Sequence, residues 1–183
     1  MLDALRPRLV AADDAATRFA DASAAVAVLL RERPGAEVLV TERARRESDP
    51  WSGQWSFPGG RRQPGEPLLH AAWRETEEEV GLPLRDRSPL GCLPARSPRN
   101  RPGLVVLPFV FAWDGPEEAH ARAEVDAVAW VPLAGLPSTR TTARITVRDL
   151  ELEMPAFVEG RRTIWGFTYR VLEELLPLLP ADA

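Results

Sequence analysis

The stretch GGRRQPGEPLLHAAWRETEEEVGL, residues 59–82, contains the clearest helix of this 183-residue chain. Leu68–Val80 is predicted to be helical because its apolar residues gather on one side of a helical wheel. Pro67 suits the first helical position, where a missing N–H costs nothing. Gly81 suits a left-handed C-terminal cap. The stretch therefore predicts an amphipathic helix with defined ends in the middle of the chain.

The polar side of this helix carries acidic residues. Glu75, Glu78 and Glu79 stand at positions i, i+3 and i+4, so their Cβ atoms lie about 5–6 Å apart on one face, where like charges destabilise a helix. A divalent cation bound between the carboxylates would turn this repulsion into a favourable interaction, and Mg²⁺ and Mn²⁺ prefer oxygen ligands. The alternative is a solvated acidic face, as in most Glu-rich helices. That alternative leaves the upstream Gly59–Gly60 pair unexplained.

The spacing of these residues resembles the signature of the Nudix hydrolases. That signature runs from a Gly through five residues to a Glu, then through seven residues to Arg-Glu-U-x-Glu-Glu-x-Gly-U, where U is a bulky apolar residue. Here Gly60 and Glu66 match its first part, and residues 74–82, RETEEEVGL, match its second part. The one departure is Thr76 at a U position, where its methyl group can still pack.

The resemblance implies an α/β fold, a Nudix-type α/β/α sandwich with a mixed β-sheet. It implies metal-dependent hydrolysis of a pyrophosphate bond in a nucleoside diphosphate linked to another group, with Mg²⁺ or Mn²⁺ as cofactor. The metal ligands carried over by position are Glu75, Glu78, Glu79 and the carbonyl oxygen of Gly59. Arg74 and Glu66 would form a pair that braces the loop against the helix. Glu79 is also a candidate catalytic residue.

The general base is left open by the sequence. In this family it is a signature glutamate or an acid on a later loop. Glu124, just before the expected strand at 125–131, is the candidate on that loop, and Glu117 and Glu118 are its rivals. A solvated loop charge is an equally good interpretation of each of these three.

Residues 39–60, LVTERARRESDPWSGQWSFPGG, resemble the accessory motif of the coenzyme A pyrophosphatase branch. The start and end of that motif match, but the middle is one residue longer, and Ser48 stands where an Arg is expected. The expected substrate-binding residues are Arg43, Arg45, Arg46, Phe57 and Gly60. Because all 23 basic residues are Arg, an Arg-rich surface loop is the plain alternative. A second similarity to the branch is RRTIWGFTYRVLEELL, residues 161–176.

The rest of the chain predicts strands at 24–30, 37–41, 104–113 and 125–131, one or two edge strands within 145–154, and a helix at 165–179 that ends or kinks near Pro177. Residues 1–20 are expected to form a short helix or loose arm, and residues 21–183 a single Nudix hydrolase domain.

The composition restricts the kinds of partner that this chain is expected to bind. The net charge of −4 argues against a general nucleic-acid coat. No apolar run approaches the roughly 18 residues of a membrane span. One cysteine, Cys92, and no recognisable secretory signal favour a cytoplasmic protein. The expected partner is a small nucleotide; the resemblance also allows a homodimer, although no interface is visible in the sequence.

Three functions follow from these residues. The first is hydrolysis of coenzyme A or an acyl-CoA to 3′,5′-ADP and a 4′-phosphopantetheine product. The second keeps the chemistry but acts on ordinary or oxidised dNTPs, dinucleoside polyphosphates or ADP-sugars. The third is a Nudix-fold module that binds a metabolite without turnover. The third is disfavoured because every acid of the signature is present.

Overall fold

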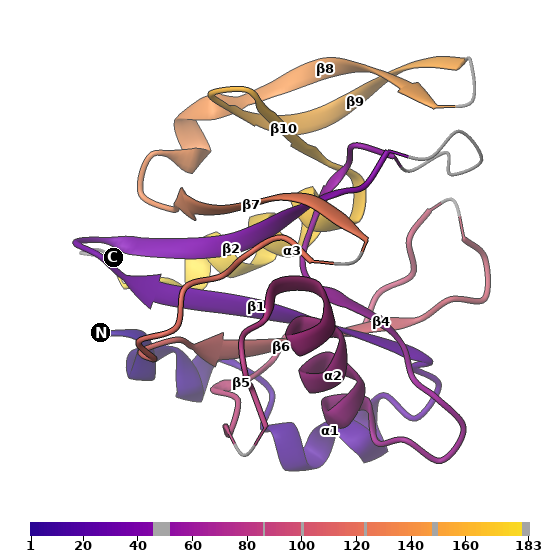
Figure 1. Ribbon diagram of the computed structural model, residues 1–183, viewed down its shortest axis with the longest axis vertical. Coiled ribbons are helices and arrows are strands. Elements are labelled where there is room, and N and C mark those ends of the chain that lie inside the picture. The colour runs from indigo at the N-terminus through magenta and orange to yellow at the C-terminus, as the bar shows by residue number, and fades with distance from the viewer. Residues whose placement is uncertain (46–51, 86, 100, 123, 148–149, 181–183) are drawn as a thin grey trace.

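The computed structural model describes residues 1–45, 52–85, 87–99, 101–122, 124–147 and 150–180. Within these residues the chain forms two sheets and several helices (Figure 1). The strands are β1 (Ala24–Glu32), β2 (Ala36–Arg43), β3 (Trp55–Ser56), β4 (Gly59–Arg61), β5 (Gly91–Cys92), β6 (Val106–Ala112), β7 (Val125–Pro132), β8 (Arg140–Val147), β9 (Leu150–Glu159) and β10 (Arg162–Trp165). The helices are α1 (Ala12–Arg18), α2 (Leu68–Val80) and α3 (Gly166–Leu175), with 3-10 turns η1 (Leu2–Arg8), η2 (Leu136–Thr139) and η3 (Leu176–Leu178).

The main sheet is mixed, as predicted. Its path is β3-β2-β1-β6-β5, with β4 joined to β1 and β7 joined to β2. Strand β1 runs parallel to β6 and antiparallel to β2 and β4. Helices α1 and α2 cover one face and α3 covers the other (Figure 1). The α/β/α sandwich is therefore confirmed.

The central strands are buried on both faces, which explains their unbroken apolar sequences. In β1, Ala25, Ala27 and Leu29 pack toward α2, whereas Val28 and Leu30 pack toward α3. Strand β6 alternates in the same way. The sheet is thus the shared wall of two hydrophobic cores, and each helix is held by the core on its own side.

The expected helix at Leu68–Val80 is confirmed with both ends. Gly81 has φ 74°, the left-handed conformation that glycine adopts without strain. Pro67 is the N-cap, with ψ 142°, so it lies one residue before the predicted position. At the C-terminus, α3 ends at Leu175 and the 3-10 turn that contains Pro177 follows, as the proline predicts.

Of the two alternatives for residues 1–20, the structure has the helical one: they form η1 and α1, and Leu2 and Leu5 are buried in the α3-side core. The expected edge strands within 145–154 are longer, as β8 and β9, and they form a separate three-stranded sheet with β10. Strand β10 follows β9 directly across the turn at Gly160–Arg161, and no strand was predicted there.

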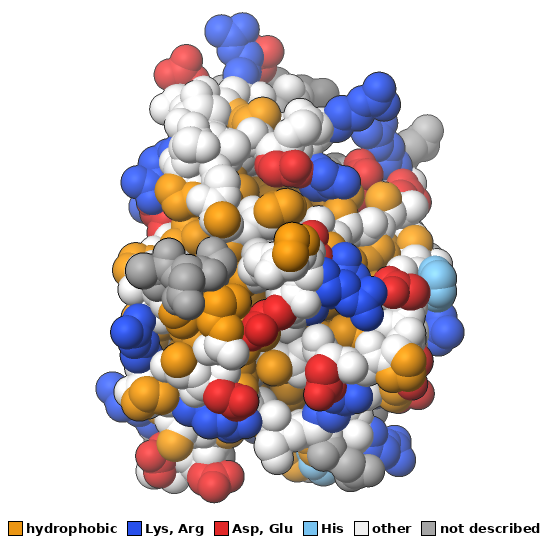
Figure 2. Space-filling view, turned by 90° about the vertical axis from the view of Figure 1, so that its left-hand side faces the viewer, with side chains coloured by type: hydrophobic (Ala, Val, Ile, Leu, Met, Phe, Trp, Pro, Cys, Tyr) orange, Lys and Arg blue, Asp and Glu red, His pale blue; other side chains and the backbone are white. Residues whose placement is uncertain are grey.

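The surface carries both acidic and basic side chains, as expected from a chain with 27 acidic and 23 basic residues. Figure 2 shows acidic and basic side chains interspersed over one broad face, with apolar side chains between them.

Every helix of the described residues is too short or too polar to cross a bilayer.

Candidate active site

The acidic helix lies where two strands diverge from a common neighbour. Strand β1 pairs with β2 at Leu30–Glu32 but with β4 at Ala24–Val26. Between them, the Ala27 N–H donates to the carbonyl oxygen of Pro58 at 2.9 Å. Helix α2 packs on β4 and β1 beside this divergence.

The glycine pair of β4 makes close approach possible. Gly59 has φ 151°, and a Cβ there would overlap the carbonyl oxygen of Ala25 and lie 2.6 Å from the Cα of Val26. A Cβ on Gly60 would overlap the carboxylate of Glu75. Gly59 therefore lets β4 approach β1, and Gly60 leaves the space that the Glu75 carboxylate occupies.

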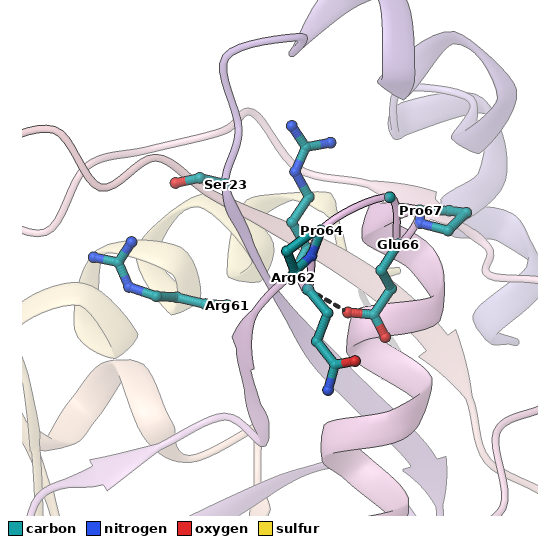
Figure 3. A pocket seen from close by; sticks show the side chains of 8 residues that line it. Ser23, Arg61, Arg62, Pro64, Glu66 and Pro67 are labelled. Carbon is teal, nitrogen blue, oxygen red and sulfur yellow. Dashed lines mark hydrogen bonds between the residues drawn. The ribbon is translucent and has the colours of Figure 1, made fainter.

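The loop from β4 to α2 borders a hollow of about 600 Å³. Ser23 and residues 61–67 line it (Figure 3). Arg61 and Arg62 were not among the predicted site residues, although they follow the glycine pair directly in the sequence. Their place in the signature was the available signal, because two guanidinium groups beside a glycine-rich loop suit anions.

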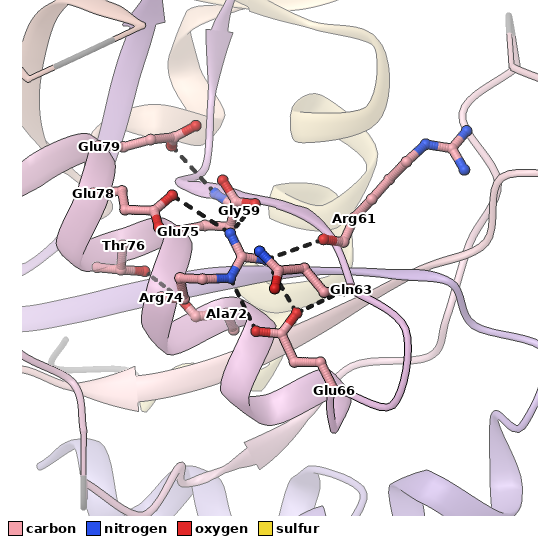
Figure 4. Close-up of polar contacts among 10 residues, drawn as sticks. All are labelled: Gly59, Arg61, Gln63, Glu66, Ala72, Arg74, Glu75, Thr76, Glu78 and Glu79. Atoms are coloured by element: carbon pink, nitrogen blue, oxygen red, sulfur yellow. Dashed lines mark hydrogen bonds and ion pairs between the residues drawn. The ribbon is translucent and has the colours of Figure 1, made fainter.

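Arg74 joins the loop to the helix (Figure 4). Its Nε and Nη2 donate to the two carboxylate oxygens of Glu66 at 2.9 and 3.1 Å, a bidentate pair. Its Nη1 donates to Glu75 at 2.7 Å and reaches Glu78 at 3.4 Å. The Arg74 hydrogen bonds hold the pKa of Glu66 below its usual range. The expected Arg74–Glu66 pair is therefore present.

Glu79 has the most perturbed carboxyl group of the helix. Its Oε2 accepts the N–H of Gly59 at 3.3 Å. Burial, followed by repulsion from Glu75, raises the pKa of Glu79 to about 8. Arg43 lowers this pKa and Glu124 raises it, so both side chains lie close enough to act on Glu79. Four residues from three separate segments thus share one electrostatic environment.

The loop acid Glu124 meets the end of β2. Arg43 Nη2 lies 3.8 Å from its Oε2, and the Ala44 N–H donates to its carbonyl oxygen at 2.8 Å. The rival Glu118 instead pairs with Arg33 at 3.2 Å and Arg31 at 3.6 Å. Of the loop acids considered, Glu124 is the one that the structure brings to Glu79.

A family model described as NUDIX domain matches residues 21–150. The chain belongs to the Nudix family. It is therefore a hydrolase, and the expected resemblance to the coenzyme A pyrophosphatase branch is confirmed by its relatives. Human mitochondrial coenzyme A diphosphatase NUDT8 is 34% identical over 178 residues, which cover 94% of this chain and 75% of that protein.

Two further comparisons show similarity to a nucleotide phosphatase and to a solved Nudix structure. Human 8-oxo-dGDP phosphatase NUDT18 is 33% identical over 116 residues, covering 62% of this chain and 33% of that protein. The crystal structure of the Nudix hydrolase RenU from M. smegmatis matches with a TM-score of 0.52 and 22% identity, covering 64% of this chain and 74% of the other. At that identity the match supports the fold alone.

The Nudix acids fit a hard divalent cation by donor chemistry, but their arrangement differs from the prediction. Among the residues that the structure describes, no three Asp, Glu, His or Cys side chains are grouped as ion ligands. The Arg74 guanidinium contacts both Glu75 and Glu78. Glu79 is half-buried beside Glu75, a position in which a bound cation would relieve repulsion. The donor set therefore fits, with Arg74 as the present counter-charge of two ligands.

The expected substrate residues have different outcomes. Arg43 lies beside Glu124 in the site. Arg45 is 80% exposed, and its guanidinium lies 3.9 Å from Glu42. Arg46 lies outside the described residues. Phe57 is only 3% exposed and packs in the α3-side core, so its ring anchors the loop from inside.

Proposed function

We propose that this chain hydrolyses the diphosphate of coenzyme A or an acyl-CoA to 3′,5′-ADP and a 4′-phosphopantetheine product. The observation that carries the proposal is the 34% identity to a coenzyme A diphosphatase along 94% of the chain. The placement of Arg43 beside Glu79 and Glu124 supports it, because Arg43 belongs to the motif shared with that branch.

A divalent cation, Mg²⁺ or Mn²⁺, is part of the proposal. Glu75, Glu78, Glu79 and the Gly59 carbonyl oxygen would hold it, and it would offset the negative charge that develops in phosphoryl transfer. Glu78 is 57% exposed, so its side chain has room to leave Arg74. The Arg74–Glu66 pair would keep the loop in place while that contact changes.

The chain's own groups would do the remaining chemistry. A water attacks one phosphorus of the diphosphate, the bridging P–O bond breaks, and the proton of the water passes to a carboxylate. Glu79 and Glu124 lie close enough for Glu124 to raise the pKa of Glu79, and one of these two carboxylates is the proposed acceptor. Arg43 is positioned to neutralise a phosphate oxygen through its guanidinium.

A substrate panel tests the proposal. Purified chain is assayed with coenzyme A, acetyl-CoA, 8-oxo-dGDP, dNTPs, ADP-ribose and diadenosine polyphosphates, with Mg²⁺ and with Mn²⁺, and products are identified by mass. The expected result is the highest kcat/KM for coenzyme A or acetyl-CoA, with 3′,5′-ADP released. Inert coenzyme A alongside rapid turnover of another nucleotide would reject the substrate and keep the reaction class.

The second candidate is an oxidised nucleoside diphosphate. It is favoured by the match to human 8-oxo-dGDP phosphatase NUDT18 and by the one-residue departure within residues 44–53. The same panel separates the two, because 8-oxo-dGDP lacks the 3′-phosphate and the pantetheine arm. Lack of turnover with every substrate, together with measurable nucleotide binding, would favour the non-catalytic alternative.

A further inference from the structure

The α3 side of the main sheet carries arginines in a defined row. Arg61 of β4 is the register partner of Ala24, Ala24 is the partner of Val106, and Val106 bridges to Arg96. Residues in one row across neighbouring strands project from the same face. Arg61 and Arg96 therefore flank Ala24 and Val106, about 14 Å apart at the backbone for three strand spacings.

Strand alternation fixes which face this is. Gly60 points at Glu75 on the α2 side, so its neighbour Arg61 points to the opposite side. Figures 3 and 4 both show the Arg61 side chain extending away from α2. The three residues of β4 thus present glycine backbone to the acidic helix and a guanidinium group to the other face.

Helix α3 adds a further arginine. Phe167 packs on the apolar cluster that contains Ala24 and Val106, and Arg170 lies one turn along the same helical face. Arg170 Nη2 donates to the carbonyl oxygen of Ser97 at 2.7 Å. The helix therefore places Arg170 against the segment that precedes β6, next to Arg96 and Arg99.

These arginines outnumber the acids paired with them. Arg96 is neutralised by Glu174 at 2.6 Å. Arg61 and Arg99 are exposed, and neither has a hydrogen bond or ion pair from its side chain to any described residue. Burial, then repulsion from Arg96 and Arg99, lowers the pKa of Arg170. Like charges held together in this way favour an anion between them.

We propose that Arg61, Arg99 and Arg170 form a second phosphate site, which holds a phosphomonoester of the nucleotide on the side of the sheet away from the acidic helix. The site rests on the proposed function only in naming that group as the 3′-phosphate of coenzyme A. Strand β4 links the two sites, because Gly59 and Gly60 border the acidic helix that would act on the diphosphate, and Arg61 would bind the second phosphate.

The site is tested by binding rather than turnover. The full chain is titrated calorimetrically with 3′,5′-ADP and with 5′-AMP, which differ in one phosphomonoester. The wild type is expected to bind 3′,5′-ADP at least about tenfold more tightly, since a hydrogen bond to a charged group contributes about 1.5–3 kcal/mol. The preference should weaken as salt is raised.

Arg61→Ala and Arg99→Ala are each expected to reduce this preference at least threefold, and the double variant to abolish it. Arg161→Ala, an exposed arginine in the turn between β9 and β10, removes the same charge from the second sheet and should keep the preference. No preference in the wild type, or an unchanged preference in both single variants, overturns the site. Absence of coenzyme A hydrolysis with the preference intact rejects the proposed function and leaves the site standing.

Discussion

The signature segment, residues 59–82, and the β8–β9 hairpin are both rich in charge, yet they are held together differently. In the signature segment, one arginine contacts three acids and a backbone carbonyl oxygen, and two glycines admit the neighbours. In the hairpin, Leu150 is 64% exposed and Leu152 is 41% exposed, and the ion pair of Arg144 with Glu151 is 3.9 Å long between exposed side chains.

Substitutions should have larger effects in the signature segment than in the hairpin. Each group in the signature segment has several partners, so removing one leaves others buried and unmatched. The hairpin groups face solvent, which replaces what a substitution removes. Sensitivity to mutation should therefore follow contact and burial rather than the number of charges.

The largest expected effect is on turnover. Glu79→Gln removes a proposed metal ligand and one of the two candidate proton acceptors, so kcat should fall by about 10²–10⁴-fold. Glu77→Gln on the same helix and Glu151→Gln on the hairpin remove equal charge from exposed positions and should stay within about twofold. Steady-state kinetics with the preferred substrate measure this, and intact turnover in Glu79→Gln would refute the assignment.

The second effect is the pH dependence of the free energy of unfolding, measured with a chelator present so that no metal is bound. Below about pH 4.5, Glu79 is protonated in the folded and unfolded chain, so it adds no penalty. Between pH 4.5 and about 8 the unfolded chain ionises first, because burial raises the folded pKa of Glu79 to about 8. The free energy of unfolding should therefore fall with rising pH across that window and then level off.

Urea denaturation at a series of pH values measures this slope, and Glu79→Gln should flatten it. Glu66 should act in the opposite direction, since its pKa is lowered by Arg74. Its contribution is present above the unfolded pKa and is lost as pH falls through the folded value. An identical pH profile for wild type and Glu79→Gln would show that Glu79 does not titrate as described.

The third effect is a difference in coupling. A double-mutant cycle with Arg74→Ala and Glu66→Gln should give a coupling free energy of about 1–3 kcal/mol, because the pair is bidentate and partly buried. The same cycle with Arg144→Ala and Glu151→Gln should give about 0–0.5 kcal/mol. Chemical denaturation measures both. Equal coupling in the two pairs would remove the distinction between the regions.

The smallest effect lies in the hairpin's apolar side chains. Leu152→Thr introduces a β-branched residue suited to a strand and removes a side chain that is already 41% exposed. It should change the free energy of unfolding by less than about 0.5 kcal/mol. Loss of several kcal/mol, seen by thermal or chemical denaturation, would mean that this surface is covered in solution.

The site was predictable to the extent that it depends on local spacing. The helix at Leu68–Val80, the left-handed Gly81 and the Arg74–Glu66 pair follow from residues at most fourteen positions apart. The inward turn of Phe57 and the contact of Glu78 with Arg74 were missed. Both depend on which of several neighbours a side chain contacts in the folded protein, and the spacing of residues along the sequence does not reveal that.

Periodicity and fixed offsets along one helix were enough to identify the family, the amphipathic helix, the main strands and the acids of the signature. The proximity of Glu124 and Arg43 to Glu79, the packing of residues 2–18 on the rest of the chain and the shared row of Arg61 and Arg96 come from the fold alone. Those contacts join segments tens of residues apart, and their formation depends on sheet register and on the burial of whole faces.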